Sequence, residues 1–151
     1  RQNEKRRSGR MTKVLVPVDG SEFSDRAVDY VIELAKGQEP LDLHLLSVQI
    51  PIDSGHARMF VSDDDIDAYH RDEGMAVLKP YIEKLDAAGI PHNHHVLVGH
   101  VALTIARFAK EQNFDKVVMG THGRSGLTQL LLGSVAQNVV RRLKIPVALV
   151  K

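Results

Sequence analysis

Cysteine is absent from this chain of 151 residues. Its absence excludes disulfides, thiol chemistry and zinc sites built on cysteine. No run of apolar residues approaches the roughly 18 that suggest a membrane span, and no secretory signal is visible. The length fits a single domain that buries its own core. We therefore expect a cytoplasmic protein with one domain and no membrane contact.

Positive charge is concentrated at the N-terminus. Residues 1–10 hold five basic residues and one acidic residue, which leaves 15 of the 20 basic and 18 of the 19 acidic residues for the rest of the chain. A nucleic-acid-binding domain normally presents a basic face. The rest of this chain is mildly acidic, which argues against nucleic acid as a partner of the folded domain. Residues 1–10 contain no apolar side chain, and we interpret them as a disordered leader or a vector remnant. A contact between this leader and nucleic acid or anionic lipid stays open.

The domain is expected to span residues 11–151, where apolar periodicity predicts alternating strands and helices. Alternation of this kind implies a parallel sheet with helices on both faces. Ser24 is a candidate N-cap, and Pro80 predicts a kink or a break in its helix. The expected strands are 13–18, 41–48, 92–98, 116–119 and 145–150, and the expected helices are 24–36, 63–88, 101–112 and 134–143.

Ligands of doubly wound sheets bind beyond the carboxyl ends of the strands, where the strand order reverses. This rule points to Asp19, Gln49, Gly99 and Gly120, which directly follow predicted strands. The stretch 117–135 is the most informative of these regions, because it contains four glycines between a buried strand and an amphipathic helix.

Glycines at such a place let backbone amides approach an anion, and a helix N-terminus favours phosphate. Ser134 would add a hydroxyl at the cap, and His122 and Arg124 would add charge or hydrogen bonds. The alternative interpretation is a glycine-rich turn capped by serine.

The spacing Gly120-x2-Gly123-x9-Gly133-Ser134 resembles the nucleotide-binding motif of the universal stress protein family. The segment VLVPVDGS at 14–21 and the final PVALV are also similar to that family, so the resemblance covers residues 12–151. It implies an ATP-binding module, because the branch of the family that does not bind ATP detectably lacks these glycines. We predict a doubly wound α/β fold whose five-stranded, mainly parallel sheet has the order 3-2-1-4-5.

The same resemblance implies positions for the ligand. Asp19 would lie near the ribose and adenine, with Pro17 and Val18 on the same wall. The backbone of Val48 would meet adenine. Met119 and Gly120 would flank the ribose. The residues implied for the phosphates are Gly123, Gly133, Ser134 and Val135.

The sequence gives less support to other nucleotide-binding motifs, to a catalytic serine and to metal sites. A Walker A loop and a G-x-G-x-x-G fingerprint are absent, and Gly123 to Gly126 lacks the second spacer of a nucleophile elbow. The histidines at 92, 94, 95 and 100 are interpreted as a solvated strand entrance rather than a metal site, and His44 as a packing residue. The acidic run from Asp63 is interpreted as the first turn of a helix.

Nucleotide is expected to act as a conformational ligand, because no well-placed general base is evident. A divalent ion such as magnesium would bridge the phosphates. Three alternatives stay open: a slow ATPase or nucleotidyl transferase that uses Asp19, a nucleotide-independent interaction protein, and a cyclic-nucleotide binder. An apolar edge strand from Ile145 to Val150 predicts a homodimer, which the family resemblance also implies.

Overall fold

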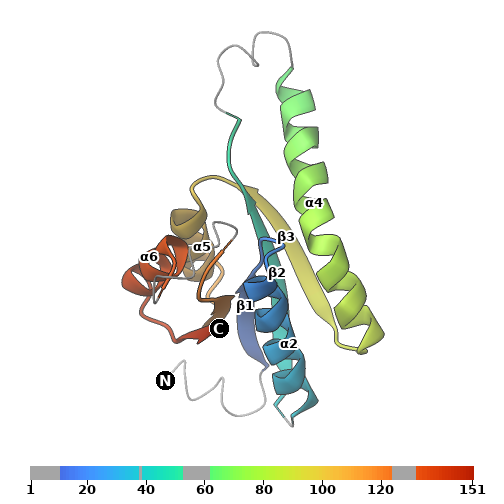
Figure 1. Cartoon of the computed structure of the whole chain (residues 1–151), viewed down its shortest axis with the longest axis vertical. Helices are drawn as coiled ribbons and strands as arrows, with labels where there is room; N and C mark the ends of the chain where they lie inside the picture. Colours follow the sequence, from blue (N-terminus) through green and yellow to red (C-terminus); the bar gives the residue numbers. More distant parts are fainter. Residues whose placement is uncertain (1–10, 38, 53–61, 124–131) are drawn as a thin grey trace.

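The computed structural model describes residues 11–37, 39–52, 62–123 and 132–151. Its elements are β1 (Thr12–Pro17), α2 (Glu22–Lys36), β2 (Leu41–Gln49), α4 (Asp63–Ala87), β3 (His92–Val98), α5 (Val101–Glu111), β4 (Lys116–Gly120), α6 (Ser134–Arg142) and β5 (Val147–Val150). The strands form one five-stranded sheet in the order β3-β2-β1-β4-β5, and each neighbouring pair is parallel. The predicted fold is confirmed. Figure 1 shows α2 and α4 on one face of the sheet and α5 and α6 on the other.

The core consists of two apolar layers, one on each face of the sheet. β1 serves both, because successive side chains of a strand point to opposite faces. Val14 and Val16 are fully buried in the layer beneath α2 and α4, and Leu15 is fully buried in the layer beneath α5 and α6. Burial of each such side chain contributes about 1.5–3 kcal/mol. A strand covered on both faces is a continuous apolar run, which is why the sequence shows one here.

Helix α2 begins earlier than its predicted cap. Ser21 is the N-cap, and its hydroxyl accepts a hydrogen bond from the Ser24 backbone N–H over 3.2 Å. The prediction that Ser24 caps the helix is therefore wrong. Ser24 lies inside the first turn, where its hydroxyl bonds a residue of the preceding loop.

Two further predicted boundaries need correction. α4 continues through Pro80 as one helix from Asp63 to Ala87. The predicted break is therefore wrong, and Leu78 and Tyr81 on either side of the proline are buried in the core. β5 begins at Val147 rather than Ile145, because Pro146 lies at the strand entrance, where its carbonyl accepts from Val117 N–H.

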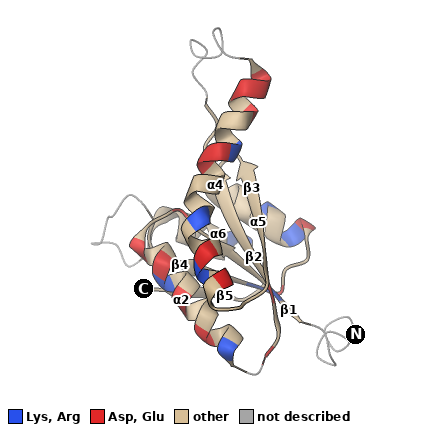
Figure 2. Ribbon diagram, turned by 90° about the vertical axis from the view of Figure 1, so that its right-hand side faces the viewer, with Lys and Arg blue, Asp and Glu red and all other residues tan. Residues whose placement is uncertain are grey.

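Helix α4 is the longest element, and its first turns extend past the end of the sheet (Figure 1). Ser62 caps it by accepting from Asp65 N–H over 3.1 Å. Acidic residues occupy its first turn, as predicted, and complement the helix dipole (Figure 2). Further along, α4 approaches β3 so closely that a Cβ on Gly74 would lie 2.4 Å from a methyl group of Val96. No helix in the described ranges is long and apolar enough to cross a membrane.

The prediction of a solvated strand entrance holds for His94, which is exposed. It is wrong for His100, which is exposed but lies beyond the other end of β3 as the N-cap of α5, and for the two remaining histidines. The largely buried ring of His92 bonds Asp86. His95 pairs with His44, whose Nδ1 lies 2.8 Å from His95 Nε2. Strand pairing places Leu46 opposite His95 and so brings the two rings together.

The His44–His95 pair is stacked against apolar rings and bonded to one carboxylate. The two imidazole planes lie 9° apart, with Phe114 at the edge of His44 and Phe108 at the edge of His95. His44 Nε2 lies 2.9 Å from Asp42 Oδ1. Burial lowers the pKa of His44, although Asp42 acts in the opposite direction. Burial, followed by the charges of neighbouring cationic groups, lowers the pKa of His95.

These lowered pKa values predict loss of stability in acid. An unfolded histidine titrates near pH 6.5, so the folded state, which prefers both rings neutral, gains stability above that pH and loses it below. We expect the melting temperature of wild type to fall between pH 7.5 and pH 5. In the His95→Phe variant this fall should be smaller by at least about 2 °C. The control is His100→Phe, because His100 is also exposed but is not among the groups that lower the pKa of His95. Equal acid sensitivity of wild type and His95→Phe would contradict this role of the pair.

Candidate functional site

The candidate site lies at the carboxyl edge of the sheet, where the chain leaves β1 and β4 in opposite directions. The strand order reverses here, because β2 and β3 lie on one side of β1, whereas β4 and β5 lie on the other. Doubly wound sheets bind their ligands at such a point.

Asp19, just beyond β1, is held by the start of α2. Its Oδ1 accepts hydrogen bonds from Ser21 N–H over 2.9 Å and from the Ser24 hydroxyl over 2.8 Å. Its own backbone N–H donates to Ser24 Oγ over 3.0 Å. Gly20, with φ +84°, supplies the left-handed turn that folds the chain back onto the carboxylate.

Thr121, at the end of β4, is bonded to Gly133 at the start of α6. Thr121 N–H donates to the Val150 carbonyl over 2.9 Å, and Gly133 N–H donates to the Thr121 carbonyl over 2.7 Å. A Cβ on Gly133 would lie 3.1 Å from that same carbonyl oxygen and 3.2 Å from His122 Cα. Glycine at 133 therefore allows α6 to begin directly against the end of β4.

A second glycine brings the β1 and β4 loops together. A Cβ on Gly123 would lie 2.7 Å from Asp19 Oδ2, which is closer than side chains tolerate. The carboxylate therefore has one oxygen bonded within its own loop and the other directed at the glycine loop. Any larger residue at 123 would displace either Asp19 or the backbone beside it.

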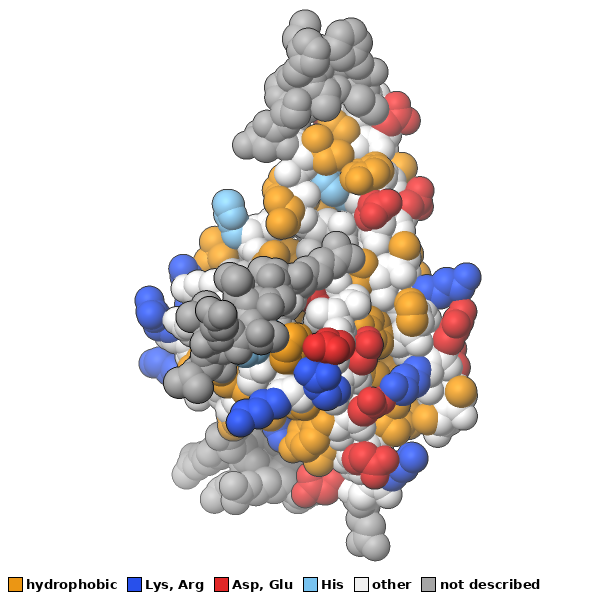
Figure 3. Space-filling view, viewed as in Figure 1, with side chains coloured by type: hydrophobic (Ala, Val, Ile, Leu, Met, Phe, Trp, Pro, Cys, Tyr) orange, Lys and Arg blue, Asp and Glu red, His pale blue; other side chains and the backbone are white. Residues whose placement is uncertain are grey.

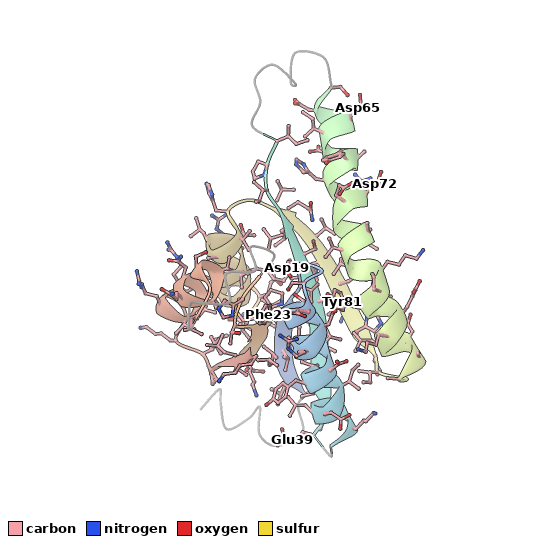
Figure 4. The ribbon with its side chains drawn as sticks, in the orientation of Figure 1. Asp19, Phe23, Glu39, Asp65, Asp72 and Tyr81 are labelled. Carbon is pink, nitrogen blue, oxygen red and sulfur yellow. The ribbon has the colours of Figure 1, made fainter. Side chains whose placement is uncertain are left out.

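Phe23, in the first turn of α2, packs against His122 and Gly120 at the end of β4. The rings of Phe23 and His122 are 5.0 Å apart, and the Arg26 guanidinium lies 4.7 Å from the centre of the Phe23 ring on α2. A Cβ on Gly120 would lie 2.6 Å from Phe23 Cβ. Figure 4 shows Asp19 and Phe23 near one another at the start of α2.

The electrostatic character of the site changes from one end to the other. Asp19 supplies an ionised carboxylate, which only accepts hydrogen bonds. α6 begins at Ser134 with Gly133 in the N-cap position, has no acidic residue in its first turn and has no side-chain cap among the described residues. Such a helix end attracts anions. The arrangement suits a ligand with hydroxyl or amino groups at one end and negative charge at the other.

Comparisons with known proteins identify the family of this chain. The model of the universal stress protein family matches residues 11–151. The chain belongs to the universal stress protein family. It is 32% identical to universal stress protein YxiE of Bacillus subtilis over 92% of this chain and 98% of the relative. It is 31% identical to universal stress protein MJ0531 of Methanocaldococcus jannaschii over 92% and 81%.

Solved structures show the same universal stress protein fold. That of MJ0577 from Methanocaldococcus jannaschii has a TM-score of 0.80, with 26% identity over 93% of this chain and 95% of that one. A universal stress protein solved in complex with cAMP has a TM-score of 0.65, with 28% identity over 93% and 96%.

In this universal stress protein, the predicted site residues fall into two groups. Asp19, Gly120, His122, Gly123 and Gly133 converge at the loops just described. The others flank or underlie them: Pro17, Val18 and Met119 are buried at the ends of β1 and β4, Val48 and Val135 are half-buried on β2 and α6, and Ser134 is exposed as the first residue of α6. Arg124 lies outside the described residues.

Sequence reasoning missed Phe23, Ser24 and Thr121. All three are buried. Ser24 carried a usable signal, because it lies on the same helical stripe as the core residues Ala27 and Val28. A hydroxyl on an apolar stripe needs a hydrogen-bond partner, and the nearest acceptor outside the helix is Asp19.

Among the described residues, no group of three or more His, Asp or Glu side chains could hold a metal ion. The residues present fit a divalent ion only if a ligand's own phosphates supply most of its oxygens.

Proposed function

We propose that this universal stress protein binds an adenine nucleotide, with ATP as the expected ligand, between the β1 and β4 loops. The observation that carries the proposal is the convergence of Asp19 with Gly123 and Gly133 at the N-terminus of α6. The nucleoside would lie on the Asp19 side and the phosphates against the glycine loop and α6. The similar structure solved with cAMP supports an adenine nucleotide as the ligand class.

Nucleotide would act in this proposal as a conformational ligand rather than a substrate. Asp19 Oδ1 already accepts two hydrogen bonds, an arrangement that orients a carboxylate more than it prepares a base. A divalent ion such as magnesium would bridge the phosphates. Binding would stabilise the arrangement of loops that it fits and shift the population toward it.

Calorimetric titration of the purified protein with ATP, AMP and cAMP, each with and without magnesium, tests the proposal. We expect saturable binding of one of them, and magnesium should strengthen only the binding of ATP. Mass spectrometry of the denatured protein would identify any nucleotide carried through purification. Preference for cAMP would favour the cyclic-nucleotide alternative, and the absence of binding by all three would refute the proposal.

The basic leader is not needed for this function. We expect deletion of residues 1–10 to leave ATP affinity within about twofold of wild type, because the proposed site is built entirely from residues of the 11–151 domain. The same titration measures the affinity of the truncated chain. A loss of more than tenfold would show that the leader contributes to the site.

A further inference from the structure

The Asp19 carboxylate depends on a hydroxyl that lies outside the glycine motif. Ser24 Oγ donates to Asp19 Oδ1 and accepts the Asp19 backbone N–H, at 2.8 and 3.0 Å. Ser24 is only 5% exposed, so water does not compete well for these bonds. One hydroxyl thus bonds both the backbone and the side chain of Asp19, and together with the Ser21 N–H on the same oxygen it orients the carboxylate.

The turn that carries Ser24 is itself fixed from α4. The Tyr81 hydroxyl donates to Asp25 Oδ1 over 2.6 Å, and Tyr81 is 4% exposed. Burial, together with the hydrogen bond and charge of Asp25, raises the pKa of Tyr81, so its hydroxyl stays protonated as a donor at neutral pH. Figure 4 shows Tyr81 on α4 facing the same end of α2 that holds Asp19.

We propose that Ser24 is the positioning residue of the candidate nucleotide site and that Tyr81 holds its turn in place. Ser24, together with the Ser21 N–H, keeps one oxygen of Asp19 within the β1 loop and so leaves the other directed toward Gly123, where the ligand would lie. This inference rests on the proposed nucleotide function and adds to it a residue that acts through Asp19.

The chemistry of the ligand allows an effect of Ser24 on nucleoside recognition to be distinguished from a general effect on the fold. An ionised carboxylate accepts hydrogen bonds only, and the donors of an adenine nucleotide are its ribose hydroxyls and adenine amino group. Phosphates offer no donor at neutral pH. Loss of the Ser24 hydroxyl should therefore weaken recognition of the nucleoside and leave recognition of a bare polyphosphate unchanged.

The experiment compares ATP and inorganic tripolyphosphate on the full chain, with wild type, Ser24→Ala and the matched pair Ser24→Thr and Ser24→Val. Threonine keeps the hydroxyl, and valine has the same shape without it. We expect Ser24→Ala and Ser24→Val to lose about tenfold in ATP affinity, with Ser24→Thr within about threefold of wild type and tripolyphosphate unaffected throughout. Tyr81→Phe should lose about threefold for ATP alone, since its effect passes through Asp25 and Ser24.

Three results would overturn the role of Ser24 while the nucleotide function stood: unchanged ATP affinity in Ser24→Ala, equal affinities in Ser24→Thr and Ser24→Val, or equal losses for ATP and tripolyphosphate. A wild-type protein that bound no adenine nucleotide would overturn both the proposed function and this role.

Discussion

Replacement of Gly133 with valine is expected to lower ATP affinity at least about tenfold, equivalent to about 1.4 kcal/mol, while the fold survives. The new Cβ would meet the Thr121 carbonyl oxygen at 3.1 Å and His122 Cα at 3.2 Å, and both are backbone atoms. The β4 loop would have to move away from α6. In the proposed complex the same side chain would also project where a phosphate approaches the helix N-terminus.

A matched control separates local crowding from damage to the site. A Cβ on Gly37 would lie 3.1 Å from the Leu34 carbonyl oxygen, at the opposite end of α2 from Asp19. Gly37→Val therefore introduces comparable backbone crowding away from the nucleotide loops, and its ATP affinity should match wild type. Circular dichroism would establish that both variants are folded before titration. Unchanged affinity in a folded Gly133→Val protein would remove this loop from the site.

Replacement of Val147 with proline is expected to convert a homodimer into a monomer. β5 is an edge strand with all four side chains partly exposed. The carbonyls of Pro146 and Val150 accept hydrogen bonds from the β4 side, so by alternation the N–H and carbonyl groups of Val147 and Leu149 point away from the sheet. Unpaired edges of this kind recruit a partner strand, and a two-fold axis would pair two copies of β5.

Val147→Pro removes one outward amide and leaves the pairing with β4 intact, whereas Val147→Ala keeps the amide and is the control. Leu149→Asp should also favour the monomer, but it is the less specific change because Leu149 packs against the core beneath α5 and α6. Light scattering at micromolar concentration would measure the masses. A monomeric wild type would refute the dimer, and dimeric Val147→Pro and Leu149→Asp variants would place the interface elsewhere on the surface. Figure 3 shows that charged side chains of both signs are intermixed on one face of the molecule.

Most of the fold was predictable because its signals are local. β1 and β4 are short apolar runs, and α2, α5 and α6 bury one apolar side each, so most of the alternation of elements follows from periodicity. The boundaries that failed depended on contacts beyond the element itself. Ser24 was misread as a cap because its hydroxyl bonds Asp19, and the start of β5 was misplaced because Pro146 contributes only a carbonyl to the pairing.

The histidines illustrate the same limit. His94 and His95 are adjacent in the sequence, yet one is exposed and the other is stacked on His44 from a neighbouring strand. Only the register between β2 and β3 decides that partnership. A shift of one residue would turn each side chain to the other face, and composition carries no information about such a register.

By itself, the sequence determined the α/β alternation, the absence of thiol chemistry and the presence of glycines where a strand gives way to a helix. The tertiary structure decided which distant residues those glycines meet. Gly123 lies against Asp19 only because β4 is placed beside β1, and Tyr81 reaches the turn of Ser24 only because α4 packs against α2 on one face of the sheet. The physical reason is that local propensities form the elements, whereas strand order and core packing bring together residues that are far apart in the chain.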